Sequence, residues 1–170
     1  MKIIRDRRIV DDDWNRVADD AALPSAGRII VSWTRWQADR AALRARGSVG
    51  VSIPSTLDVA ELKDDLAALA LVAIPFSFIQ PKPEGGRTFD GRAYSQARLL
   101  RERYGFAGEI RAAGDVFRDA MFYMQRCGVN AFELSPGHDL QDALKAFGDF
   151  SLGYQGAADD PTPIFRRRKA

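Results

Sequence analysis

Leu71–Phe76 (LVAIPF) is a continuous apolar run. Such a run is typical of a β-strand that is covered on both faces, because neither face then needs polar side chains. Just before it, Leu62, Leu66 and Leu69 recur at helical spacing, and Thr56 or Asp58 is placed to cap a helix. The stretch therefore predicts a helix that leads into a buried strand.

The same alternation continues in both directions along the chain, with glycine or proline ending most segments. The predicted strands are Arg28–Trp36, Val49–Ile53, Leu71–Phe76, Glu109–Ala113 and Ala131–Leu134. The predicted helices are Gln37–Arg46, Thr56–Ala68, Gly91–Tyr104, Asp115–Arg126 and Asp139–Phe150. Alternating strands and helices indicate βαβ units, so we predict an α/β fold with a mainly parallel sheet of about five strands. An open doubly wound sheet and a partial β/α barrel both satisfy this pattern, and it leaves the strand order open.

The two ends of the chain have different patterns. Residues 1–27 are predicted to form an N-terminal arm with a short hairpin or cap, in which Asp13 caps a brief helix through Asp20. Residues 28–150 are predicted to form a single α/β domain. Residues 151–170 contain several glycines and prolines and end in the basic run Arg166–Lys169, so we predict an extended or flexible tail.

Composition excludes several classes of protein. The formal net charge of +2 is too small to indicate a nucleic-acid-binding protein. The sequence starts without the apolar run of a signal peptide, and no stretch approaches the ~18 apolar residues of a membrane span, so we predict a cytoplasmic protein that does not bind membranes. Cys127 and His138 are the only residues of their types, and the acidic residues lack metal-loop spacing. We therefore predict no metal site, and no cofactor fingerprint is identifiable.

The segment Phe89–Ser95 (FDGRAYS) precedes and opens a predicted helix on the side where parallel α/β folds bind ligands. Four residues follow along one side of that helix and form a candidate anion-binding surface: Arg92, Ser95, Arg98 and Arg101. The alternative is structural. In that case Asp90 caps the helix and pairs with Arg92, while the other arginines are solvated or pair with Glu102.

Four side chains near predicted strand ends are candidates for catalysis: Asp90, Tyr94, Asp115 and Asp119. Asp115 follows Gly114 and has the position of a helix N-cap, which by itself explains an aspartate there. Asp119 is expected to form a surface pair with Arg118, although two aspartates near a strand end can also divide acid and base roles. Cys127 ends the same helix, far from the N-terminus that would lower its pKa, which favours a buried thiol over a redox nucleophile.

The stretch from Phe89 to Glu133 resembles a bacterial family known only as domain of unknown function 934. The matching residues are Phe89-Asp90-Gly91-Arg92, Tyr94-Ser95, Ala97-Arg98-Leu99-Leu100-Arg101, Gly105, Gly108-Glu109, Arg111-Ala112, Gly114-Asp115-Val116, Asp119, Arg126-Cys127-Gly128 and Ala131-Phe132-Glu133. The resemblance is looser but continuous back to about Arg28. Members of this family are found beside genes of sulfate and sulfite reduction and often carry the label oxidoreductase.

The resemblance implies a role in cysteine biosynthesis but supplies no catalytic residues. The first hypothesis is an accessory protein that binds an oxyanion or a sulfite-reducing enzyme, either sulfite reductase or phosphoadenylyl-sulfate reductase. The second is an enzyme of sulfur metabolism, an oxidoreductase according to the family label, with its site at the strand carboxyl ends. A third is a regulatory domain that senses a sulfur metabolite. The oligomeric state is left open.

Overall fold

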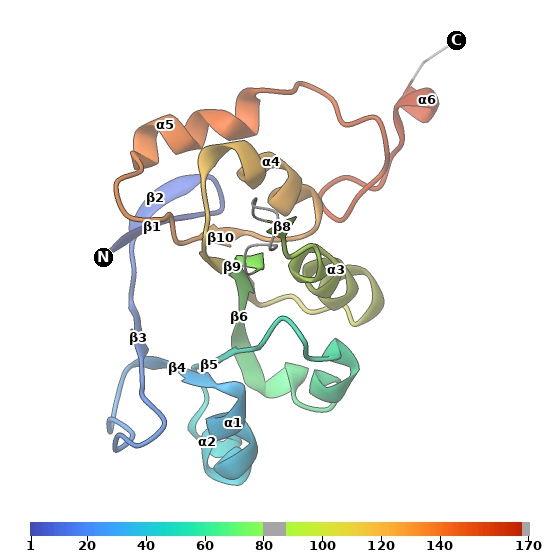
Figure 1. Cartoon of the computed structure of the whole chain (residues 1–170). Coiled ribbons are helices and arrows are strands. Elements are labelled where there is room, and N and C mark those ends of the chain that lie inside the picture. The colour runs from blue at the N-terminus through green and yellow to red at the C-terminus, as the bar shows by residue number, and fades with distance from the viewer. Residues whose placement is uncertain (80–87, 168–170) are drawn as a thin grey trace.

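The computed structural model describes residues 1–79 and 88–167. The predicted loop that contains Pro81, Pro83, Gly85 and Gly86, and the last residues of the basic tail, lie outside these ranges. Figure 1 shows one curled sheet with helices around its outside. The sheet has eight strands in the order β2-β1-β10-β9-β6-β5-β4-β3. Their bounds are β1 (Lys2–Arg5), β2 (Arg8–Asp11), β3 (Trp14–Arg16), β4 (Arg28–Ser32), β5 (Val49–Ser52), β6 (Leu69–Phe76), β9 (Glu109–Gly114) and β10 (Ala131–Phe132).

The α/β class and the mainly parallel sheet are confirmed. Strands β3, β4, β5, β6, β9 and β10 run parallel, and β6 pairs with β9 from Leu71↔Glu109 to Phe76↔Gly114. Strand β1 pairs antiparallel with both β2 and β10. The predicted number of about five strands was too small, because residues 2–16 add three more.

The sheet curls because a short connection joins its two edges. Strand β2 ends at Asp11 on one edge, and β3 begins at Trp14 on the other. Three Cα–Cα steps reach at most about 11 Å. Eight strands laid flat would span about 34 Å, since neighbouring strands lie about 4.8 Å apart. The edges must therefore approach each other, and of the two predicted arrangements the partial barrel is the one observed.

The N-terminal residues form sheet where a helix was expected. The predicted hairpin is present as β1 and β2, whose turn residues Asp6 and Arg7 both have positive φ (49° and 59°), as a type I′ turn requires. The brief helix predicted from Asp13 to Asp20 is wrong, because Trp14–Arg16 pairs with Arg28–Ile30 as strand β3. As part of strand β3, Trp14 is only 6% exposed. Burial of this large apolar side chain stabilises the strand.

Most predicted helices are present but shorter. The helices and helical turns of the described residues are α1 (Trp33–Ala38), α2 (Arg40–Arg46), η1 (Val59–Leu62), η2 (Leu66–Ala68), α3 (Arg92–Arg98), η3 (Leu99–Arg103), α4 (Arg118–Arg126), α5 (Leu140–Leu144), η4 (Lys145–Gly148) and α6 (Ile164–Arg167), of which α6 was not predicted. The first predicted strand ends early at Ser32, whose Oγ accepts a hydrogen bond from Arg35 N (3.0 Å) and caps α1. The predicted helix Thr56–Ala68 is instead the two 3₁₀ turns η1 and η2.

The sheet has two differently packed faces. The outer face carries Val51, Val72 and Ile74 against buried helix residues such as Leu100 and Met121. On the inner face, which is turned away from the helices, a smaller cluster contains Trp14, Ile30, Leu71 and Ala73. A Cβ on Gly50 would come within 2.8 Å of the Leu71 side chain, so only glycine permits this packing. Among the described residues, no helix has the length and apolarity needed to cross a membrane.

Candidate functional site

The predicted site segment lies where β6 and β9 end. A short second sheet, β7 (Phe78–Ile79) and β8 (Thr88–Phe89), leads into it. Asp90 N donates to Ser77 O (2.9 Å), and Asp115 N donates to Phe76 O (2.6 Å). The chain thus brings Asp90 and Asp115 to the carboxyl end of β6.

Asp90 is committed to structural contacts. It is 3% exposed, and its carboxylate accepts hydrogen bonds from Arg92 Nη2 (2.8 Å), Arg92 Nε (2.9 Å) and Arg92 N (3.0 Å). The Arg92 side-chain hydrogen bond holds the pKa of Asp90 at about 2 against the opposing effect of burial, and Ser55 contributes a further hydrogen bond. The carboxylate is therefore ionised at neutral pH and is a poor general acid or base there.

The candidate anion-binding residues are divided between surface and interior. Arg92, Ser95 and Arg98 lie exposed on α3, and Arg98 Nε donates to Glu102 (2.9 Å). Arg101 does not continue this row, because the nine residues from Arg92 to Arg101 correspond to about two and a half turns even of a regular α-helix, which places Arg101 on the opposite side. Its guanidinium donates to Gly108 O (2.7 Å), Gly128 O (2.9 Å) and other acceptors. Arg101 thus holds the chain together, while the other three share a surface.

Tyr94 belongs to an aromatic cluster. Its ring lies edge-on to Phe76 at 5.0 Å and tilted against Tyr123 at 5.0 Å, with Phe89 at 5.9 Å. Burial raises the pKa of the Tyr94 hydroxyl. The side chain is therefore protonated at neutral pH and acts in packing.

The remaining candidates lie around α4. Asp115 is half-buried in the loop before the helix and is not its N-cap, since α4 begins at Arg118 with Phe117 in the cap position. Asp119 is exposed in the first turn of α4. Cys127 closes the helix at 5% exposure, and burial raises the pKa of its thiol, as expected for a packed side chain.

A cluster of buried charges lies on the inner face of the sheet and was not predicted from the sequence. Arg111 is 0% exposed and contacts the carboxylates of Glu109 (2.7 Å), Asp12 (2.9 Å) and Glu133 (3.0 Å). Burial by itself would lower the pKa of Arg111, but the carboxylates of Asp12 and Glu109 raise it above its usual value. The only signal in the sequence was a charged pair, Glu109 and Arg111, within an otherwise apolar strand.

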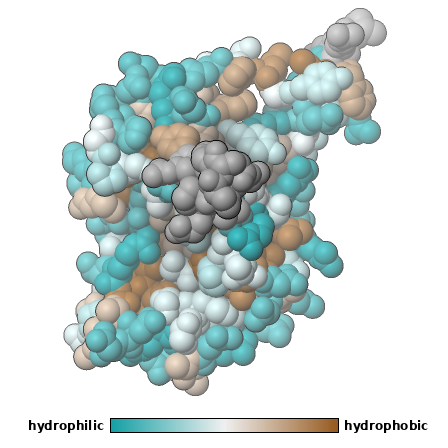
Figure 2. Space-filling model, in the orientation of Figure 1, coloured by the Kyte–Doolittle hydropathy of each residue, from teal (hydrophilic) through white to brown (hydrophobic). Residues whose placement is uncertain are grey.

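A groove between α4 and the C-terminal tail was also missed. It has a volume of about 600 Å³. Four of its lining side chains are large and well exposed: Tyr123 (59%), Phe150 (62%), Leu152 (51%) and Tyr154 (76%). The basic residues on its wall are Arg98 and Arg126. Figure 2 shows hydrophobic surface along the tail in the upper right of the molecule, beside hydrophilic surface.

Arg126 holds the tail in place to form this groove. Arg126 Nη1 donates to Asp159 (2.9 Å), Arg126 Nη2 donates to Gln155 O, and Ala158 N donates to Arg126 O (3.1 Å). A Cβ on Gly153 would come within 2.6 Å of Arg126 Cζ, so glycine lets the tail backbone lie against the guanidinium. The end of α4 therefore determines where the exposed tail side chains lie.

Together, the curled, mainly parallel sheet and the helices around it define an α/β protein. The family model described as bacterial protein of unknown function (DUF934) matches residues 50–165. This match covers more than half of the chain, so the chain belongs to that family. Strands β1–β4 precede the matched region. No curated protein and no solved structure matches the chain.

Proposed function

We propose that the chain is a cytoplasmic accessory protein of assimilatory sulfate or sulfite reduction that binds a sulfite-reducing enzyme. The observation that supports binding is the groove between α4 and the tail. Large exposed apolar patches on a folded protein mark interaction sites, since leaving them in water is unfavourable. The pathway and the two partners, sulfite reductase and phosphoadenylyl-sulfate reductase, come from what the family resemblance implies.

The composition of the groove suits a protein partner. Tyrosine and phenylalanine are enriched in the centres of protein interfaces because they bury a large area at low entropic cost. Tyr123, Phe150 and Tyr154 provide such side chains. Arg98 and Arg126 on the wall are each paired with a carboxylate, Glu102 and Asp159 respectively, so the apolar and aromatic side chains of the groove carry the argument for a protein partner.

The test measures binding of the full chain to each purified enzyme by surface plasmon resonance. The double variant Leu152→Ala, Tyr154→Ala should weaken binding at least about tenfold, since truncating two central apolar contacts typically costs more than about 1.4 kcal/mol. The matched control is Leu99→Ala, which removes an exposed leucine that lies outside the groove lining. The proposal fails if neither enzyme binds, or if the control and the groove variant behave alike.

An enzyme of sulfur metabolism, an oxidoreductase by the family label, is the second candidate. It is favoured by the exposed row Arg92, Ser95 and Arg98 beside the carboxyl end of β6. Thermal unfolding with sulfate, sulfite and adenosine phosphosulfates tests this surface, because a ligand at about a hundred times its Kd adds about 2.7 kcal/mol. A rise in Tm that Arg98→Ala abolishes would support an oxyanion site there. An unchanged Tm with every ligand would contradict it.

A further inference from the structure

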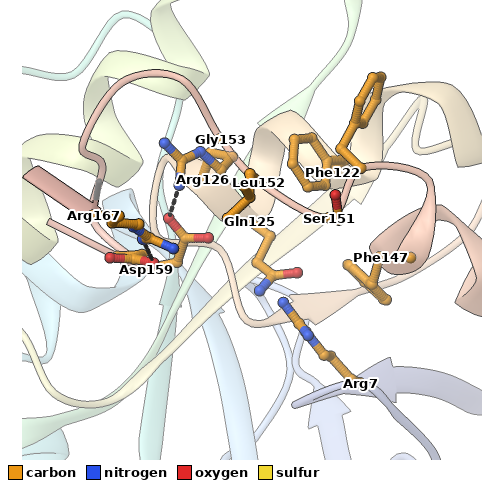
Figure 3. A pocket seen from close by; sticks show the side chains of 13 residues that line it. Arg7, Phe122, Gln125, Arg126, Phe147, Ser151, Leu152, Gly153, Asp159 and Arg167 are labelled. Atoms are coloured by element: carbon orange, nitrogen blue, oxygen red, sulfur yellow. Dashed lines mark hydrogen bonds and ion pairs between the residues drawn. The ribbon is translucent and has the colours of Figure 1, made fainter. Parts of the chain in front are cut away.

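A second hollow lies between the β1–β2 turn, α4 and the start of the tail (Figure 3). Its volume is about 410 Å³, within the range of pockets that hold small molecules. Its floor is formed by Arg7, Gln125 and Phe147, none of which lines the groove. The two hollows share part of their walls: Phe122, Arg126, Phe150, Leu152 and Gly153. We call it the Arg7 cavity.

Arg7 brings a charge that no carboxylate neutralises. Within residues 1–79 and 88–167, no Asp or Glu lies within ion-pair distance of its guanidinium. The other two arginines of the cavity are neutralised, because Arg126 pairs with Asp159 (2.9 Å) and Arg167 pairs with Asp160. An anion in the cavity would therefore find its electrostatic partner in Arg7.

The neighbours of Arg7 orient its guanidinium. Figure 3 shows Arg7 and Gln125 pointing toward one another. With the Gln125 amide oxygen turned to Arg7, it accepts from Arg7 Nη2 (2.7 Å) and Nε (3.2 Å). The guanidinium carbon lies 5.7 Å from the centre of the Phe147 ring. Gln125 is a neutral partner that engages Nε and Nη2, so the guanidinium keeps its full charge and can offer Nη1 to a ligand.

The opposite wall is aromatic. The rings of Phe122 and Phe150 lie 4.9 Å apart and tilted by 46°. Phe147 adds a third ring next to Arg7. Offset or edge-on contact with such rings favours a ligand that is itself an aromatic ring.

We propose that the Arg7 cavity binds a small organic anion that carries both a phosphate, sulfate or carboxylate group and an aromatic ring or ring system. Arg7 pairs with the anionic group, and the phenylalanine rings pack against the ligand's ring. This inference does not rest on the proposed function, since it concerns a small ligand held by Arg7, which lies outside the groove.

The experiment follows backbone amide shifts by NMR as the full chain is titrated with phenyl phosphate and with adenosine monophosphate. Saturable shifts are expected at Arg7, Gln125 and Ser151 with at least one of them. Inorganic phosphate should bind at least about tenfold more weakly than the ring-bearing anion that binds, because it lacks the ring that packs against the phenylalanine side chains.

Arg7→Gly is the diagnostic variant. Glycine is favoured at the positive φ of Arg7, so the turn is retained. Affinity should fall roughly tenfold or more, since the anionic group loses its charged hydrogen-bond donor. Arg8→Ala removes the same charge from a neighbouring exposed position outside the cavity and should leave affinity unchanged.

Three results would overturn the proposal. The first is that neither ring-bearing anion gives saturable shifts. The second is that Arg7→Gly binds as tightly as the unchanged chain, with circular dichroism showing that both are folded. The third is that inorganic phosphate binds as tightly as phenyl phosphate, which would exclude a role for the aromatic wall.

Discussion

Two arginines in this molecule each tie down a distant segment of chain, in very different surroundings. Arg111 lies on the inner face of the sheet with its side chain 0% exposed and three carboxylates around it, including Asp12 of the N-terminal region. Arg126 lies at the end of α4 with its side chain 12% exposed, and it pairs with Asp159 of the tail. The first is surrounded by the folded core, and the second lies at a surface that water reaches.

The difference in burial predicts which of the two ion pairs stabilises the whole fold and which one can break while the rest of the chain stays folded. A buried charge without its partner is strongly destabilising, because water cannot reach it to take the partner's place. A partly exposed pair is worth less, because water competes and salt screens it. We therefore expect the buried ion pairs of the inner face to stabilise the whole fold, and we expect the tail to open locally without unfolding of the whole chain.

The largest effect is expected for Arg111→Met. It leaves Asp12, Glu109 and Glu133 without their shared cation, and the free energy of unfolding should fall by about 3–5 kcal/mol. Urea denaturation followed by circular dichroism measures this change. Arg16→Ala, which removes only a half-exposed partner of Glu133, is the control and should cost about 1 kcal/mol or less. Equal destabilisation in the two variants would contradict the prediction that the buried ion pairs of Arg111 stabilise the fold more than the half-exposed pair of Arg16 does.

Asp90→Asn probes an intermediate case, a buried carboxylate with an exposed partner. The pKa of Asp90 is about 2 in the folded state against 3.8 for the ordinary group. A lowered pKa gives stability that is present above about pH 4 and is lost as the pH falls toward about 2. We expect a decrease of about 1–2 kcal/mol in the free energy of unfolding at pH 7 after allowing for the exposure of Arg92, and a flatter pH dependence of unfolding from about pH 4 to 2. An unchanged pH profile would argue against the pairing.

Arg126→Ala tests the partly exposed contacts that hold the C-terminal tail against α4. The global free energy of unfolding should fall by only about 1 kcal/mol, because Arg126 bonds to the tail at the surface, where water can take the place of its side chain. Hydrogen exchange at the Ala158 amide, which donates to Arg126 O, should nevertheless become much faster as the tail loosens. Arg98→Ala, which breaks the exposed pair between Arg98 of α3 and Glu102 of η3, is the control and should not change exchange in the tail. Unchanged tail protection in Arg126→Ala would show that other interactions hold it.

The smallest effect on stability is expected for Tyr154→Ala. This side chain is 76% exposed, so its truncation should change the free energy of unfolding by no more than about 0.5 kcal/mol. Thermal unfolding measures this directly. A decrease above about 2 kcal/mol would show that Tyr154 serves packing and would remove it from the proposed binding groove.

Much of the architecture could be predicted from local pattern. The apolar run around Leu71–Phe76 and the alternation beyond it predicted the parallel strands, because burial on both faces leaves a clear signal in the sequence. The helix bounds were less accurate. Ser32 caps α1 within a segment that is apolar enough to form strand throughout, and the pattern of residues 56–68 could not distinguish a helix from two 3₁₀ turns.

The candidate residues illustrate a similar limit. Helical spacing placed Arg92, Ser95 and Arg98 on one exposed side, as α3 shows. It failed at Arg101, which lies about two and a half turns after Arg92 and therefore on the other side of the helix, where it is part-buried. Because a step of three residues is shorter than a turn of 3.6 residues, a row at this spacing drifts around the helix and leaves the starting side after two or three steps.

The sequence by itself determined the α/β class, the parallel strands and the family, because hydrophobic periodicity and residue identity are local properties. Only the tertiary structure decided that residues 2–16 complete the sheet, that Arg111 joins Asp12 to Glu109 and Glu133, and that the tail forms two hollows against α4. These features depend on contacts between segments far apart in the chain. Such contacts follow from sheet order and curvature, which the spacing of apolar residues along the chain does not encode.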